Sequence, residues 1–152
     1  MPADSQPSLH IVVLAAGKGT RMKSALPKVL HHAAGAPLID HVLGAAAPLA
    51  PDSVIVVIGH QTEQVQAHLT DSGVQTAVQE PQLGTGHALL QAEPFLRGKT
   101  GTLLLLSGDV PLLRPATVAQ IQANAHSGER MPPKTTFFHP KPKTGIVFRD
   151  LT

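Results

Sequence analysis

The sequence predicts an α/β fold with a Rossmann-like, doubly wound and mainly parallel sheet. Short apolar runs alternate along the chain with segments whose apolar residues recur every three to four positions, the spacing of a half-buried helix. The runs LHIVVL, VIVVI and TLLLL are apolar almost throughout, as in strands that are covered on both faces. Right-handed crossovers between such strands place helices on both sides of the sheet.

The expected elements alternate between strand and helix from residue 9 to residue 125. Pro37 and Pro115 each suit a first helical turn, where a missing amide hydrogen breaks no bond. Pro94 falls within the third helical segment, so we expect that helix to end or kink there. The predicted strands cover residues 9–14, 54–58, 73–79 and 102–106, and the predicted helices cover residues 37–49, 61–69, 86–93 and 115–125.

The composition indicates one domain without thiol chemistry. A chain of 152 residues, of which 42% are hydrophobic, can bury a core of its own. Cysteine is absent, which excludes disulfides, zinc–thiolate sites and thiol catalysis. No apolar run has the length of a membrane span, and the first residues lack the pattern of a signal peptide. We therefore expect a cytoplasmic protein with no membrane partner and a disordered segment at residues 1–8.

Residues 129–152 differ in composition from the rest of the chain. They hold five of the twelve Lys and Arg but only two of the ten Asp and Glu, so they carry +3 and residues 1–128 carry −1. The alternating pattern stops after residue 126, and we expect an irregular, proline-rich tail with one short strand in residues 145–152. Phe137 and Phe138 stand among basic residues, as in some single-stranded nucleic-acid binders. Two rings in such a tail more often pack onto the body or are disordered, so we expect no nucleic-acid partner.

The first candidate site is the turn after the first strand. Gly17 and Gly19 allow a tight bend whose amide groups can point at phosphate oxygens. This stretch is not a P-loop, and Met22 stands where the dinucleotide pattern G-x-G-x-x-G needs its last glycine. An anion site and a glycine turn beside a solvated basic loop both fit the stretch alone. Four cations without any carboxylate lie within eleven residues: Lys18, Arg21, Lys23 and Lys28.

The second candidate site follows the four leucines, at Ser107, Gly108 and Asp109. A carboxylate at the end of a buried strand costs desolvation energy unless it is paired or binds a metal. The basic turn lies at the same end of the sheet, and Mg²⁺ takes one or two carboxylates together with phosphates and waters. We expect Asp109 to bind Mg²⁺, with helix capping as the alternative. The histidines have no metal-ligand spacing, and His10 is expected at the surface.

The third candidate site joins the third strand to the third helix. Gln79 carries an amide that can donate and accept, as recognition of a nucleobase edge requires. Gly84, Thr85 and Gly86 allow close backbone approach at a helix N-terminus. Taken alone, this stretch is also explained as an ordinary strand–turn–helix junction.

Four stretches occur in order within residues 9–125: LAAGKGTRM, LPKVLHHAAGAPLIDHV, QEPQLGTGHAL and SGDVPLL. In them the chain resembles the sugar-phosphate nucleotidyltransferases of the MobA-like NTP transferase superfamily. The resemblance is strongest to the N-terminal uridyltransferase domains of bifunctional uridyltransferase–acetyltransferases of bacterial cell-wall synthesis, and LGTGHA favours these over the molybdenum-cofactor guanylyltransferases. It implies a nucleotide-diphospho-sugar transferase fold and a Mg²⁺-dependent reaction of UTP with N-acetylglucosamine 1-phosphate, which yields UDP-N-acetylglucosamine and pyrophosphate.

The resemblance also implies roles for the matching residues. Lys28 would contact the phosphates and, with Arg21, would offset the charge that develops during transfer. Asp109 would bind Mg²⁺, and the adjacent Ser107 and Gly108 would contact the nucleotide. The uridine would lie against Leu14, Ala15, Ala16 and Gly17; its phosphates would be held by Gly19, Thr20 and Arg21; and the uracil edge would be read by Gln79, Gly84 and Thr85.

The parts of the family pattern that hold the acceptor sugar are not found in this sequence. These are a glycine-rich sugar loop, a Glu and an Asn for the acetylglucosamine, and a later Asn at the metal. We therefore expect an incomplete domain, with the nucleotide-binding part in residues 9–128 and an unmatched tail in residues 129–152. Three functions stay open: an active uridyltransferase, a UTP-binding chain without turnover, and a related guanylyl- or cytidylyltransferase. A sheet that stops after four strands also predicts a homo-oligomer, unless residues 145–150 pair with its open edge.

Overall fold

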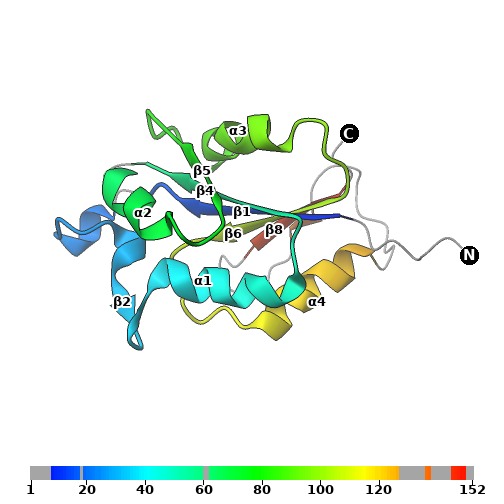
Figure 1. Cartoon of the computed structure of the whole chain (residues 1–152), viewed down its shortest axis with the longest axis horizontal. Coiled ribbons are helices and arrows are strands. Elements are labelled where there is room, and N and C mark those ends of the chain that lie inside the picture. Colours follow the sequence, from blue (N-terminus) through cyan, green and yellow to red (C-terminus); the bar gives the residue numbers. More distant parts are fainter. Residues whose placement is uncertain (1–7, 18, 60–61, 127–135, 138–144, 150–152) are drawn as a thin grey trace, which may run out of the picture.

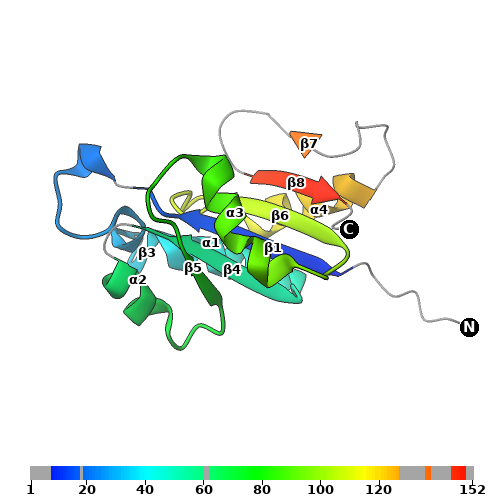
Figure 2. The same cartoon turned by 90° about the horizontal axis from the view of Figure 1, so that it is seen from above.

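The computed structural model describes residues 8–17, 19–59, 62–126, 136–137 and 145–149. Its main sheet has the strand order β5-β4-β1-β6-β8-β7 (Figures 1 and 2). Four of these strands run parallel: β1 (Leu9–Ala15), β4 (Ser53–Ile58), β5 (Gln75–Val78) and β6 (Thr102–Ser107). All four coincide with predicted strands, which confirms the α/β fold with a mainly parallel sheet.

Helices cover both faces of this sheet, as the doubly wound fold requires. Figure 1 shows α1 (Leu38–Ala46), α2 (Thr62–Leu69) and α4 (Pro115–His126) on one face and α3 (Thr85–Leu96) on the other. Successive side chains of a strand point to opposite faces, so each strand contributes side chains to the core on both sides of the sheet. In β1, Ile11 and Val13 pack with the three-helix layer, whereas Val12 packs with α3.

The third helix does not end at Pro94. It continues to Leu96, although the proline nitrogen cannot donate a hydrogen bond. Ala92 and Leu96 are buried on the face that packs against the sheet. This burial stabilises the last turn and offsets the lost hydrogen bond, because most helical stability in proteins comes from packing.

A hairpin precedes α1, and no pattern in the sequence predicts it. Its strands are β2 (His32–Ala33) and β3 (Ala36–Pro37), paired antiparallel. The turn residues Ala34 and Gly35 both have positive φ, at 48° and 88° respectively. A two-residue turn with positive φ at both positions is the common hairpin turn, but alanine rarely adopts it. The sequence therefore carried little signal for this hairpin.

His10 is buried, with 4% of its surface exposed, so the expectation of a surface histidine was wrong. Its Nδ1 lies 2.9 Å from Ser53 Oγ, and its Nε2 lies 3.2 Å from the carbonyl oxygen of Thr100. A carbonyl oxygen only accepts, so Nε2 donates to Thr100 and, in the neutral ring, Nδ1 accepts from the Ser53 hydroxyl. The imidazole thus joins β1 to the start of β4 and to the turn before β6.

The free edge of β6 is paired with β8 (Gly145–Arg149), an antiparallel strand in which Val147 lies opposite Leu104. β7 (Thr136–Phe137) pairs with β8 in turn (Figure 2). The expected short strand near the C-terminus is therefore present, and the edge that predicted self-association is covered; a homo-oligomer stays a prediction. The expectations for residues 1–7 and for the rest of the tail fall outside the described residues. Within the described ranges, no helix has the length and apolarity needed to cross a membrane.

Gly101→Ala is expected to lower the free energy of unfolding by about 3 kcal/mol. Gly101 has φ 119°, and a Cβ there would lie 2.2 Å from the carbonyl oxygen of Ser8. That oxygen accepts a hydrogen bond from the amide of Thr102 at 2.8 Å, so it cannot move without loosening the start of β6. Backbone strain of this kind costs roughly 1–3 kcal/mol, to which the clash adds. Urea unfolding measures the change.

The matched control is Gly44→Ala in α1. A Cβ at Gly44 meets nothing within 4 Å, and alanine in a helix is favoured over glycine by about 1 kcal/mol. This variant should be as stable as the parent or slightly more stable. Equal stability of the two variants would contradict the account of Gly101.

Candidate active site

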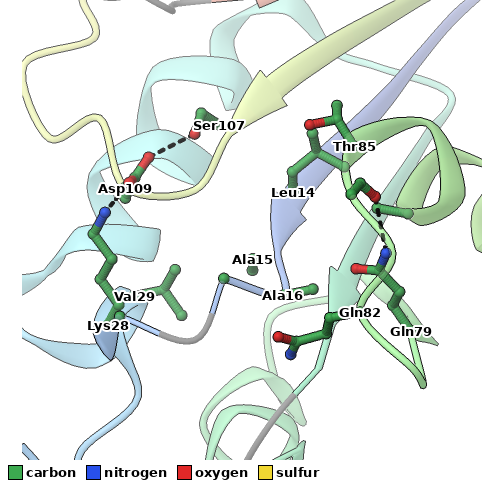
Figure 3. A pocket seen from close by; sticks show the side chains of 14 residues that line it. Leu14, Ala15, Ala16, Lys28, Val29, Gln79, Gln82, Thr85, Ser107 and Asp109 are labelled. Carbon is green, nitrogen blue, oxygen red and sulfur yellow. Dashed lines mark hydrogen bonds and ion pairs between the residues drawn. The ribbon is translucent and has the colours of Figure 1, made fainter. Parts of the chain in front are cut away.

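Three loops at the carboxyl ends of β1, β5 and β6 border a pocket of about 400 Å³ (Figure 3). Parallel strands bring their carboxyl ends to one edge of the sheet, so the three stretches singled out in the sequence meet there. Among the residues to which the resemblance assigns a role, and whose placement the structure describes in full, only Arg21 and Gly108 do not line this pocket. The lining residues are Leu14, Ala15, Ala16, Gly17, Gly19, Lys28, Val29, Gln79, Gln82, Gly84, Thr85, Ala88, Ser107 and Asp109.

The first turn places a glycine directly against the stem of Lys28. Gly19 has φ 57° and precedes a short 3-10 helix, Thr20–Met22. A Cβ on Gly19 would lie 2.9 Å from Lys28 Cβ, so glycine lets the lysine stem pack against the turn. Arg21 is exposed on this turn. Lys18 and the side chain of Thr20 are not among the parts that the structure describes.

Lys28 and Asp109 form an ion pair inside the pocket, although they are 81 positions apart in the chain. Lys28 Nζ lies 2.5 Å from Asp109 Oδ2, and Ser107 Oγ donates to Asp109 Oδ1 at 2.5 Å. Lys28 begins a 3-10 helix, Lys28–Leu30, whose other two residues are buried and anchor it. Both carboxylate oxygens therefore have a donor supplied by the chain itself.

The carboxyl group of Asp109 is held in its ionised form. Burial raises its pKa, but hydrogen bonds from Lys28 and Ser107, together with the positive charge of Lys28, bring the pKa below its ordinary value of 3.8. The stability that this group contributes is present above the ordinary pKa and is lost as the pH falls through the lower folded value. At neutral pH the pocket therefore holds a carboxylate beside an ammonium group.

Gly108 lies behind the pocket wall rather than in it. Its amide donates to the carbonyl oxygen of Leu14 at 2.8 Å. A Cβ on Gly108 would lie 3.0 Å from that oxygen and 3.2 Å from Ile39 Cδ1. The absence of a side chain thus allows the end of β6 to approach β1 closely, and this fixes the position of the neighbouring Asp109.

Gln79 is the buried polar residue of the third loop, with 4% of its surface exposed. Its Nε2 donates to the carbonyl oxygen of Gly84 at 2.9 Å and lies 3.1 Å from His87 Nδ1. Figure 3 shows the amide oxygen of Gln79 directed into the pocket, away from Gly84. Gly84 has φ 101° and ψ −178°, a conformation essentially restricted to glycine, and it precedes α3. Thr85 begins α3, so the positive end of that helix borders the pocket.

Three lining residues were not predicted: Val29, Gln82 and Ala88. Val29 and Ala88 are buried and apolar, and nothing in the sequence distinguishes such residues from the rest of the core. Gln82 stands in the polar stretch between Gln79 and Gly84, which was the one available signal. A Cβ on Gly59 would lie 2.3 Å from Gln82 Nε2, so the end of Gln82 packs directly against the backbone after β4.

The ligands that the pocket offers to a metal suit a cation that is also bound by the phosphates of a nucleotide. Asp109 is the one carboxylate among the described lining residues. Elsewhere in the described ranges, too, no group of three His, Asp or Glu side chains is placed to hold a metal. Mg²⁺ is commonly bound by one or two carboxylates, with phosphates and waters completing its octahedron. Asp109 opposite the glycine turn fits this pattern.

Known proteins share both the sequence and the fold. The family profile described as the MobA-like NTP transferase domain matches residues 11–140, and so extends past residue 128 into the C-terminal segment. The chain is 55% identical over 116 residues to the bifunctional protein GlmU of Alcanivorax borkumensis, covering 76% of this chain and 25% of that protein. It is 50% identical over 142 residues to the bifunctional protein GlmU of Burkholderia mallei, covering 93% and 31%. The chain thus spans about a quarter to a third of the length of these curated relatives.

A solved structure is also similar: Rv0371c of Mycobacterium tuberculosis H37Rv in complex with manganese. Its TM-score is 0.60 at 27% sequence identity, and the likeness covers 78% of this chain and 59% of that one. The family profile includes all three loops that border the pocket. The chain therefore belongs to the MobA-like NTP transferase domain family.

Proposed function

We propose that this pocket binds UTP and Mg²⁺ and transfers the uridylyl group to N-acetylglucosamine 1-phosphate. The observation that carries the proposal is that the glycine turn, the Lys28–Asp109 pair and the Gln79 amide border a single pocket. The choice of UTP and of the acceptor sugar rests on the resemblance of the four sequence stretches to uridyltransferase domains. The membership in an NTP transferase family supports the class of reaction.

The chemistry of the pocket changes from one side to the other, as a nucleotide requires. Lys28 and Asp109 lie on one side and Gln79 lies on the opposite side, with Leu14 and Ala16 between them (Figure 3). The phosphates would lie at the charged side and the base at the amide side. A pocket of about 400 Å³ is in the usual range for small-molecule sites, roughly 300–1,000 Å³.

The reaction needs positioning and charge neutralisation rather than a side-chain nucleophile. A phosphate oxygen of the sugar 1-phosphate attacks the α-phosphorus of UTP, the bond to the bridging oxygen breaks, and pyrophosphate leaves with the electron pair. Lys28 offsets the charge on the phosphoryl oxygens, and the amide groups of Gly17 and Gly19 orient them. When bound at Asp109, Mg²⁺ supplies further charge neutralisation. Arg21, exposed on the same turn, stays a predicted phosphate contact.

The test is pyrophosphate release by the full chain with UTP, N-acetylglucosamine 1-phosphate and Mg²⁺. Release that requires all three components supports the proposal. UTP binding by calorimetry without release would identify a nucleotide-binding chain that does not complete the reaction. Preference for GTP or CTP over UTP in competition would instead identify a related guanylyl- or cytidylyltransferase. The absence of any nucleotide binding would contradict all three functions.

A further inference from the structure

We propose that His87 is a positioning residue that sets nucleobase selectivity, because it holds the Gln79 amide with its oxygen facing the base. This inference rests on the proposed function, in which a base lies against Gln79. His87 does not line the pocket itself. It lies in the first turn of α3, and its ring nitrogen Nδ1 contacts the amide nitrogen of the buried Gln79 side chain.

The orientation of the Gln79 amide follows from the acceptor at Gly84. A backbone carbonyl oxygen only accepts, so the Gln79 atom 2.9 Å from it is the NH₂ nitrogen. That nitrogen is also 3.1 Å from His87 Nδ1, which must therefore accept the second hydrogen. In the neutral ring the remaining hydrogen is then on Nε2, which lies 3.3 Å from Gln91 Nε2. An amide nitrogen cannot accept it, so this tautomer requires the Gln91 amide to be turned with its oxygen toward the ring.

Both hydrogens of the Gln79 amide are thus used inside the chain, which leaves its oxygen to face the pocket (Figure 3). Rotation of the amide by half a turn would break both hydrogen bonds and would bring its oxygen against the Gly84 carbonyl oxygen. Gln79 is buried, so groups left without partners are costly. The pocket therefore presents a fixed acceptor to the base.

A fixed acceptor distinguishes between pyrimidines. Uracil carries a ring N–H that donates to such an oxygen, whereas cytosine has an unprotonated, accepting nitrogen at the same ring position. A site that hydrogen-bonds one substrate group discriminates strongly against an analogue that lacks it, since a buried polar group is then left unpaired. Without His87, one amide hydrogen of Gln79 has no partner. The free-energy difference between the two amide orientations is then smaller, and the flipped orientation, whose NH₂ group can donate to cytosine, is populated more often.

The experiment compares His87→Leu with His87→Asn in the full chain. Leucine and asparagine have similar shapes, but only the Oδ1 of asparagine replaces the Nδ1 acceptor. Calorimetry with UTP and with CTP, each with Mg²⁺, measures the ratio of the two dissociation constants. A neutral hydrogen bond contributes about 0.5–1.5 kcal/mol, so His87→Leu should lower the preference for UTP by roughly three- to tenfold. His87→Asn should keep the preference within about twofold of the parent.

Gln91→Leu is the control, because Gln91 lies on the other side of the His87 ring and makes no hydrogen bond to Gln79. It should leave the preference for UTP unchanged, and thermal unfolding confirms that each variant is folded. If His87→Leu does not fold, His87→Ala removes the same acceptor with a better helix former. A parent chain that does not bind UTP would overturn the proposed function. A parent that prefers UTP, with the preference retained in His87→Leu or His87→Ala, would overturn the role of His87 alone.

Discussion

Asp109→Asn is expected to lower the rate of pyrophosphate release by about a thousandfold, and Asp109→Ala is expected to abolish it. Asparagine keeps the shape of the aspartate side chain but removes the negative charge that Mg²⁺ and Lys28 both require. Loss of one charged or polarising group in a water-excluded site typically costs about 10²–10³ in rate, and loss of the metal adds to this. The side chain is held at the end of β6 by Ser107, so the variant should fold.

The matched control is Asp71→Asn, which removes the same charge from an exposed residue outside the pocket. Its rate should equal that of the parent within about twofold. Rates are compared at saturating UTP and Mg²⁺, so that weak binding is not mistaken for slow chemistry. Full activity of Asp109→Asn would contradict the proposed role of Asp109 in binding the metal.

Lys28→Met is expected to bind Mn²⁺ more tightly in the absence of nucleotide, while its turnover falls by about a hundredfold. In the parent chain Lys28 Nζ is 2.5 Å from Asp109 Oδ2, so a cation and Lys28 compete for the same oxygen. The side chains of the pair are 38% and 31% exposed, and pairs of this kind contribute up to about 1 kcal/mol. The Mn²⁺ dissociation constant should therefore fall by up to roughly fivefold. Electron paramagnetic resonance of free Mn²⁺ measures it directly.

Lys23→Met controls for the change in net charge. Lys23 stands on the same turn, but it is exposed and does not line the pocket. If both variants bind Mn²⁺ more tightly by the same factor, the gain comes from net charge and not from the ion pair. Looser binding by Lys28→Met would contradict competition between Lys28 and the metal.

The strands and helices could be predicted because each depends on local patterns of apolar residues. The run VIVVI becomes β4, and the helical spacing after Pro37 becomes α1, without reference to distant residues. The position of the pocket also followed, since parallel strands bring their carboxyl ends together. The hairpin at residues 32–37 could not be predicted in this way, because its turn places alanine at positive φ.

The contacts within the pocket depend on residues that are distant in the chain. Lys28 and Asp109 were expected to contact a phosphate and a metal separately, and only the packing of the 3-10 helix Lys28–Leu30 places them side by side. His10 was expected at the surface, because a single polar residue in an apolar strand does not reveal the partners that satisfy it. Ser53 and Thr100, which bind its two ring nitrogens, are 43 and 90 positions away.

The most direct test of the account is a crystal structure of the chain with a non-hydrolysable UTP analogue and Mn²⁺, with the metal located by anomalous scattering. We expect the base against Gln79, the phosphates at the glycine turn, and an anomalous peak within about 2.5 Å of an Asp109 oxygen. Lys28 Nζ should then lie on the phosphates rather than on Asp109. A nucleotide bound outside this pocket, or a metal peak away from Asp109 with the Lys28–Asp109 pair intact, would contradict the account.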